Sequence, residues 1–424
     1  MFGCAEKNNK DLKEAGSNLK IIVATDLHYL ADACHDGGLR SQEVYDARDG
    51  KVTEYGKEVI MAFVDTCIKE NADAVLLTGD LTFNGEKKSH IELAQLLQPL
   101  KEANIEVMVM PGNHDIRNPF AYSFEGDKIY YVSTVETDEF VDIYQDYGYG
   151  DAYMRDENSL SYVYKISEDI WMMLIDANGY EWNSAFGLDS MGAIKAKTVE
   201  WMKTCFEKAE KAGATILMST HHSLLENEYL HSEDYRIVSH ALSAMDLMME
   251  YGSYVNFSGH IHTQSIVSNV RNDVSLFDIT TESLVVAGNN YGVITIVDHA
   301  LKYEAKSLDV DSWAKESGQT DENLLNFHEY AWQHYYDVSY THFLKNYESL
   351  DVPEEVKKDM ADLLAYMNPY YFSGRMDEIR DEVLNSKQYK RLCEFSDQFS
   401  TRYLESMLIE RELHQTSFEI AGIR

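Results

Sequence analysis

Six short apolar segments constrain the fold of this chain more than any other feature. They lie at residues 20–26, 74–80, 106–110, 170–176, 215–219 and 254–258. Each is rich in aliphatic or β-branched residues and has the length of a buried strand. Segments with helical periodicity lie between them, at residues 55–70, 86–103 and 193–212. This alternation predicts an α/β fold with parallel strand pairing.

The pattern changes after residue 262, where short alternating runs predict a region made mostly of strands. These runs lie at residues 264–269, 274–279, 283–287 and 292–297. From about residue 311 the strands end and aromatic residues recur near helical spacing, which predicts a helical C-terminal subdomain. We expect one buried aromatic stripe, and the alternative is a platform that stacks bases or carbohydrates. The stripe consists of Phe327, Tyr330, Trp332, Tyr336, Tyr340, Phe343 and Tyr347.

The N-terminal residues predict a tether before the first strand. Met1-Phe2-Gly3-Cys4 resembles the end of a bacterial lipoprotein signal, in which a Gly-Cys pair precedes cleavage and the Cys carries lipid. We therefore expect an exported protein, either a cell-surface lipoprotein or a secreted one, and the alternative is a cytoplasmic protein. The predicted division is a tether over residues 1–18, an α/β domain over 19–310 and a helical subdomain over 311–424.

The net charge of −35 disfavours two classes of partner. Proteins that bind nucleic-acid polymers present a basic surface, whereas no run of Lys or Arg here is longer than a pair. Binding to an anionic membrane through charge is disfavoured for the same reason. No segment approaches the roughly 18 uninterrupted apolar residues of a transmembrane helix. We expect membrane contact only through the N-terminal lipid anchor.

Polar motifs follow five of the predicted strands and are rich in His, Asp and Asn. They are Asp26-Leu27-His28, Gly79-Asp80, Gly112-Asn113-His114-Asp115, His221-His222 and Gly259-His260-Ile261-His262. Functional groups of open α/β sheets gather beyond the carboxyl ends of the strands, so these motifs are expected to converge. A single Gly-Asp is usually a turn, but five such motifs in this order are very improbable by chance.

The residue types in these motifs point to a metal site. Asp, Asn and His offer oxygen and imidazole ligands without a thiolate, which suits Mn, Fe, Zn or Ni. Seven candidate ligands exceed the needs of one tetrahedral zinc but serve two metal ions that share a bridging carboxylate. We favour His221 over His222, because only one of two adjacent side chains on an extended segment faces the site. We expect ordinary surface or core roles for His35, His90, His231, His240, His299, His328, His334, His342 and His414.

The five motifs together resemble those of the calcineurin-like metallophosphoesterase superfamily, over about residues 20–300. Within it, the chain is similar to bacterial class III cyclic-nucleotide phosphodiesterase-like enzymes, and more narrowly to their exported Gram-positive branch. The closer likeness lies at residues 79–90 (GDLTFNGEKKSH), 156–163 (DENSLSYV) and 321–327 (DENLLNF). One departure is Ser223, where many relatives have a proline.

The resemblance implies a four-layer α/β/β/α sandwich and a role for each motif residue. The first of two divalent or trivalent transition-metal ions would be bound by Asp26, His28 and His262. The second would be bound by Asn113, His221 and His260. Asp80 would bridge both ions together with a hydroxide. His114 would contact the phosphate and protonate the leaving oxygen.

The function implied by the resemblance is metal-dependent hydrolysis of a small phosphoester by attack of the bridging hydroxide. The expected substrates are phosphodiesters of cyclic or other small nucleotides. The alternatives are a phosphomonoester, a phospholipid headgroup, a nucleic-acid polymer, and a non-catalytic binding protein on the same scaffold.

Overall fold

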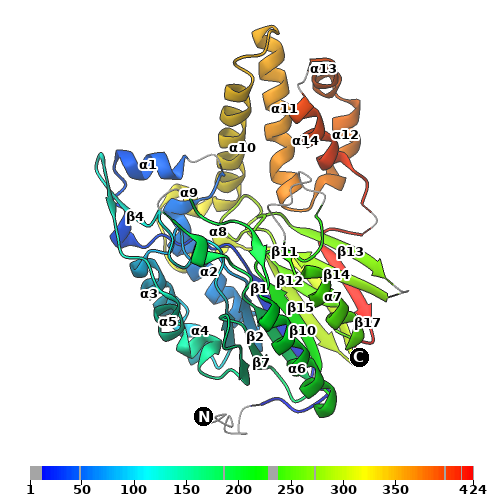
Figure 1. Cartoon of the computed structure of the whole chain (residues 1–424). Helices are drawn as coiled ribbons and strands as arrows, with labels where there is room; N and C mark the ends of the chain where they lie inside the picture. Colours follow the sequence, from blue (N-terminus) through cyan, green and yellow to red (C-terminus); the bar gives the residue numbers. More distant parts are fainter. Residues whose placement is uncertain are drawn as a thin grey trace.

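Two β-sheets form the centre of the molecule (Figure 1), and a helical bundle stands at one end of them. The computed structural model describes residues 12–46, 49–184, 187–227, 237–271, 274–395, 398–411 and 413–423. Cys4 lies outside these residues, so lipidation at Cys4 stays a prediction. The end of the predicted tether is attached to the sandwich, because Gly16 donates its backbone N–H to Asp169 at 2.8 Å.

The first sheet has six strands among the described residues, in the order β17-β16-β15-β1-β2-β3. Their bounds are β1 Leu19–Ala24, β2 Ala74–Leu77, β3 Glu106–Val109, β15 Asn290–Val297, β16 Ala300–Ser307 and β17 Ser417–Ala421. β1, β2 and β3 pair in parallel, whereas β15, β16 and β17 pair antiparallel. The predicted parallel pairing is therefore confirmed where the first three motifs follow their strands.

The second sheet has the order β13-β14-β12-β10-β8-β7-β6. Its strands are β6 Met154–Arg155, β7 Tyr162–Lys165, β8 Ile170–Ile175, β10 Thr215–Thr220, β12 Val255–Ser258, β13 Ser265–Arg271 and β14 Val274–Thr280. β8, β10, β12 and β14 are parallel neighbours. The carboxyl ends of β10 and β12, where the remaining two motifs begin, therefore lie at one edge of this sheet.

The side chains of β8 show how the two sheets are layered. Met172 and Leu174 join the core that also contains Val23 of β1, so the two sheets pack face to face. Trp171 and Met173 point to the opposite face and pack against α6 Ala196–Ala212 and α7 Ala241–Glu250. This alternation is the period of two that a strand buried on both faces requires.

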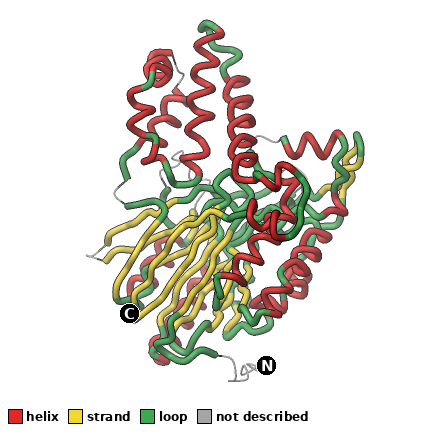
Figure 2. Tube along the Cα trace, turned by 180° about the vertical axis from the view of Figure 1, so that it is seen from behind, coloured by secondary structure: helices red, strands yellow, loops and turns green. Residues whose placement is uncertain are grey.

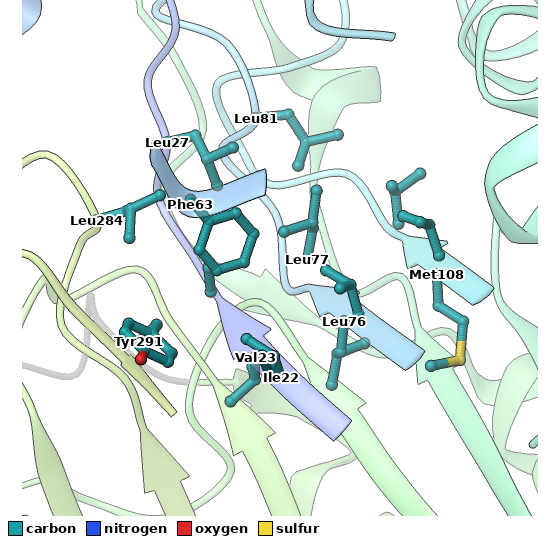
Figure 3. Close-up of a cluster of buried hydrophobic side chains, with 14 of the residues drawn as sticks. Ile22, Val23, Leu27, Phe63, Leu76, Leu77, Leu81, Met108, Leu284 and Tyr291 are labelled. Carbon is teal, nitrogen blue, oxygen red and sulfur yellow. The ribbon is translucent and has the colours of Figure 1, made fainter. Parts of the chain in front are cut away.

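Helices also cover the outer face of the first sheet. They are α2 Gly56–Lys69, α3 Lys87–Leu96, α4 Gln98–Glu102 and α5 Thr137–Ile143. Phe63 of α2 packs among Leu27, Leu77 and Leu284 (Figure 3), and its ring centroid lies 6.2 Å from that of Tyr291. The order helix, sheet, sheet, helix confirms the predicted four-layer α/β/β/α sandwich. Smaller elements beside it are α1 Leu39–Tyr45, β4 Tyr122–Glu125, β5 Lys128–Tyr131, β9 Gly192–Ala193 and β11 Ile237–Ser239.

The C-terminal region is helical, as predicted (Figure 2). It has a hydrophobic core of its own. Its helices are α8 Val310–Glu316, α9 Glu322–Leu325, α10 Phe327–Asn346, α11 Glu354–Phe372, α12 Arg380–Asn385, α13 Lys387–Phe395 and α14 Gln398–Leu408. Val286 and Ala287 of the sandwich extend into this core, which fixes the bundle on the sandwich. Among the described residues, every helix is too short or too polar to cross a membrane. The boundaries predicted at residues 18 and 310 stay predictions.

Three details of the predicted elements are wrong. Residues 283–287 form a buried turn rather than a strand, and Leu284 donates its N–H to the Thr25 carbonyl at 3.1 Å. The chain returns to the first sheet as β17 after the helices. The buried stripe of α10 follows Phe327, Ala331, Tyr335, Ser339 and Phe343, whereas Tyr330, Trp332, Tyr336 and Tyr340 are only half-buried.

Candidate metal centre

The five motifs lie at the carboxyl ends of five strands, at the edge where the two sheets meet the bundle. Asp26, Asp80 and Asn113 follow β1, β2 and β3 of the first sheet, while His221 and His260 follow β10 and β12 of the second. Backbone hydrogen bonds join the loops, because Asp26 donates its N–H to the Gly79 carbonyl at 3.0 Å and Gly259 to the His221 carbonyl at 2.9 Å. The fold therefore brings the motifs together as predicted.

Several residues of these loops have a left-handed backbone conformation that is uncommon for residues other than glycine. They are Asp26, His28, Asp80, His260 and His262, with φ values of 51°, 40°, 48°, 72° and 55°. Each such residue costs on the order of 1–3 kcal/mol and persists where the surrounding structure enforces it. The concentration of this strain on candidate ligands indicates that the loops are shaped to aim side chains at one point.

Two motif glycines permit the close approach of these loops. Gly79 has a φ of 104°, and a Cβ there would lie 2.6 Å from the Nδ1 atom of His221. A Cβ on Gly259 would lie 2.0 Å from the Oγ1 atom of Thr25 and 2.6 Å from a carboxylate oxygen of Asp26. A larger residue at either position would displace a candidate ligand or its support.

The first ligand cluster consists of Asp26, His28 and His262. The Nε2 atoms of His28 and His262 lie 3.0 Å apart, and they lie 3.7 and 3.3 Å from Oδ1 of Asp26. The other carboxylate oxygen of Asp26 is fixed, because it accepts the Thr25 hydroxyl at 2.7 Å and the His260 backbone N–H at 2.9 Å. The three inward atoms surround a point where a small cation fits.

The second cluster consists of Asp80, His221, His260 and Asn113. Oδ2 of Asp80 lies 3.4 Å from Nε2 of His221, and that nitrogen lies 3.1 Å from Oδ1 of Asn113. Ligand atoms of Asp80, His221 and His260 all lie within 4.8 Å of one another. Nδ1 of His221 lies 2.9 Å from the Thr78 carbonyl, which accepts its hydrogen and leaves Nε2 to face the cluster.

Asp80 is part of the second cluster and also faces His28 of the first. Its Oδ2 atom, which faces His221, also lies 3.7 Å from Nε2 of His28 and 4.0 Å from Nε2 of His114. Its Oδ1 atom accepts the backbone N–H of His114 at 2.8 Å. Asp80 is buried, so its charge requires compensation inside the site. This is the position that a carboxylate bridging two cations requires.

The titration behaviour of these groups fits a cation site. Burial lowers the pKa values of His28 and His260 well below the usual range, so both imidazoles are neutral at pH 7 and offer lone pairs. Burial also disfavours protonated His221, but the Asp80 carboxylate outweighs it and raises the pKa of His221 to about 9. Without a metal, His221 is therefore protonated beside the Asp80 carboxylate, and a bound cation would compensate the same negative charge. The donor set is suited to a binuclear metal centre.

His222 faces away from the clusters, which agrees with the preference for His221. Its Nε2 atom lies 3.0 Å from the Ser190 carbonyl. Its ring centroid lies 4.2 Å from that of His260, so it packs against a candidate ligand. Burial lowers the pKa of His222 to about 3, which keeps it neutral. His222 therefore packs behind the candidate ligand His260 and is not itself a candidate ligand.

His114 lies beside both clusters and is held through its outer nitrogen. Nδ1 lies 3.0 Å from the Phe83 carbonyl and 2.9 Å from the side-chain oxygen of Asn84. Because both neighbours are acceptors, Nδ1 carries the hydrogen and Nε2 is directed toward Asp80. Asp115 fixes this loop from behind, since its carboxylate accepts the backbone N–H groups of Gly112 and Leu81 at 2.8 and 3.0 Å.

A cavity of about 710 Å³ lies in front of the ligand clusters, and part of its lining was not predicted from the sequence. Asp49 and Lys51 reach it from the loop before α2, and the Lys51 ammonium donates to Asp49 at 2.6 Å. Lys51 is buried. Burial is the main cause of the lowered pKa of His28, and the positive charge of Lys51 is the second cause. His342, expected to have an ordinary role, also lines the cavity. No pattern in the sequence around Lys51 indicates that this side chain is buried.

Comparisons with known proteins found relatives of this chain. A family model described as calcineurin-like phosphoesterase matches residues 19–264, and one described as the C-terminal domain of cyclic nucleotide phosphodiesterase matches residues 309–413. A probable cyclic nucleotide phosphodiesterase from Rhodopseudomonas palustris is 32% identical over 124 residues, which are 28% of this chain and 39% of that protein. Another from Vesicomyosocius okutanii is 41% identical over 54 residues, covering 13% of this chain and 22% of that protein. The matches thus span less than half the length of these relatives.

Solved structures that align with this chain include two phosphatases. A dimetal phosphatase from Danio rerio aligns with 68% of this chain and 96% of its own, at 10% identity and a TM-score of 0.47. A purple acid phosphatase from yellow lupin aligns with 69% of this chain and 52% of its own, at 12% identity and a TM-score of 0.46. The first family model covers more than half of the chain and every candidate ligand from Asp26 to His262. The chain belongs to the calcineurin-like phosphoesterase family.

Proposed function

We propose that this protein hydrolyses phosphodiesters of cyclic or other small nucleotides with the help of two transition-metal ions. The observation that carries this proposal is the position of Asp80 between the two clusters. Its Oδ2 atom faces His28 of the first cluster and His221 of the second. The names of the curated relatives support a diester of a nucleotide as the substrate class.

Each residue of the two clusters would have a defined role in such a reaction. Asp26, His28 and His262 would hold one ion, Asn113, His221 and His260 the other, and Asp80 both. When bound, the ions supply Lewis-acid stabilisation of phosphoryl charge and a lowered pKa for the attacking water.

His114 and Lys51 lie at the cavity side of the clusters, where the phosphoryl group enters. The Nε2 atom of His114 is positioned to donate a hydrogen to a phosphoryl or leaving oxygen when the ring is protonated. The buried Lys51 ammonium is paired with Asp49 and offers its remaining N–H groups to an anionic substrate in the same space.

The first test compares a diester with a monoester that share one leaving group. We expect purified protein loaded with Mn²⁺ to hydrolyse bis(p-nitrophenyl) phosphate with a kcat/KM about tenfold or more above that for p-nitrophenyl phosphate. A diester presents one negative charge and a second organic group, which the cavity has room to bind. The measurement is the release of p-nitrophenolate with and without prior chelation, and a reversed preference would contradict the diesterase proposal and favour the monoesterase alternative.

A further inference from the structure

The cavity in front of the ligand clusters has a second wall, which the helical bundle supplies. Asp80, Asn113 and His260 line one side of this cavity of about 710 Å³. Residues of α10, α11 and α14 line the other side, and Figure 1 shows these helices standing over the carboxyl ends of the strands. A molecule whose phosphate lies at the ligand clusters therefore extends toward the bundle.

One face of α10 forms the middle of this bundle wall. Tyr335, Ser339 and Phe343 recur every four residues along the helix, which places them on one face, and each is only 5% exposed. The ring of Tyr335 covers the loop that carries Lys51, because a Cβ on Gly50 would lie 2.0 Å from the Tyr335 ring. The aromatic wall and the buried ammonium are thus held together by this contact.

A fixed side-chain amide lies beside these rings. The hydroxyl of Tyr403 donates to Oδ1 of Asn368 at 2.7 Å, and Nδ2 of Asn368 donates to the hydroxyl of Ser339 at 3.0 Å. The two bonds hold the amide group of Asn368 in place between the two hydroxyls. An amide has a second N–H and a second acceptor site beyond these bonds. Asn368 lines the cavity, so it presents a donor and an acceptor at a defined orientation.

The two walls differ in charge. Asp49, Lys51 and Asp80 line the sandwich side, whereas the described residues on the bundle side include no Lys, Arg, Asp or Glu, and His342 is their one titratable imidazole. A second phosphate would find no cation on the bundle side. The bundle wall therefore suits the neutral part of a substrate.

We propose that the bundle wall binds the base of a nucleoside phosphodiester, with Asn368 reading the edge of the base and Tyr335 or Phe343 covering its face. A base has a flat apolar face and an edge of donors and acceptors, and aromatic rings beside a fixed amide complement both. A cavity of this volume accommodates one nucleotide. This inference rests on the proposed phosphodiesterase function and names the part of the chain that selects the substrate.

The test uses p-nitrophenyl phosphodiesters that differ only in the group retained on phosphorus. The substrates are the 5′-(p-nitrophenyl phosphates) of adenosine and thymidine, compared with methyl p-nitrophenyl phosphate. We expect the full-length protein to favour at least one nucleoside ester by about tenfold or more in kcat/KM, the effect of stacking one base. Asn368→Ala should reduce this preference about tenfold, while kcat/KM for the methyl ester changes less than about twofold. Tyr335→Leu should also reduce the ratio of nucleoside-ester to methyl-ester kcat/KM, which is the measure for this variant because its contact with the Lys51 loop affects both esters alike.

Controls separate a specificity role from a structural one. Tyr336→Leu changes the next residue of α10, which does not line the cavity, and should retain the preference. Ser339→Ala provides a milder change should Asn368→Ala reduce the melting temperature, and it should lower the preference in the same direction. Equal losses on methyl and nucleoside esters, or a wild-type protein without any preference, would overturn the inference. Absence of hydrolysis of every ester would instead refute the proposed function.

Discussion

Replacing Asp80 by Asn is expected to abolish turnover, with a loss of about a thousandfold or more in kcat for bis(p-nitrophenyl) phosphate. The substitution keeps the size of the side chain, and its amide oxygen can still accept the backbone N–H of His114. It removes the charge from the atom that faces His28 and His221. Metal content should fall below two ions per chain, because an amide is a poor bridge between cations.

The matched control for Asp80→Asn is Asp73→Asn. Asp73 immediately precedes β2, whereas Asp80 follows the same strand, so the two carboxylates lie at opposite ends. Asp73 accepts the backbone N–H of Lys20 at 2.8 Å, which an amide oxygen can also do. Asp73→Asn should retain both rate and metal content. Normal turnover in Asp80→Asn would refute the bridging role.

The second large effect is expected from His221→Ala, compared with its neighbour His222→Ala. His221 directs Nε2 toward Asp80 and Asn113, so its removal should release one metal ion and lower kcat about a hundredfold or more. His222 contacts the Ser190 carbonyl and packs against His260, so its removal should cost about tenfold or less and leave both ions bound.

The comparison of these two variants is measured by metal analysis and steady-state kinetics on the same preparations. The pair is internally controlled, because both side chains are buried imidazoles at adjacent positions. If His222→Ala loses an ion and His221→Ala does not, the assignment of the second cluster is wrong.

The candidate site could be predicted because its residues follow strands that are recognisable in the sequence. A buried apolar run followed by Asp, Asn or His is a local signal, and parallel pairing then places Asp26, Asp80 and Asn113 at one edge. The choice between His221 and His222 also follows locally, since adjacent side chains on an extended segment point to opposite sides. The sequence itself does not show the left-handed conformations that aim these residues.

Other features depend on contacts between distant segments. Residues 284–287 are apolar and buried, which periodicity cannot distinguish from a strand, yet they form a turn. Ser283, just before this turn, donates its hydroxyl to the Asp26 carbonyl at 2.7 Å. Lys51 belongs to a loop, where a charged residue is ordinarily exposed. The position of the bundle over the cavity depends on Val286 and Ala287 in its core, which no helical pattern reveals.

The most direct test of the binuclear site is the metal content of the purified protein. We expect elemental analysis, calibrated by amino-acid analysis, to find two transition-metal ions per chain after loading and dialysis. Chelation should remove the ions and the hydrolysis of bis(p-nitrophenyl) phosphate together, and adding metal back should restore both. A protein that binds no more than one ion, or that keeps full activity after complete chelation, would contradict the two clusters' role as a binuclear centre.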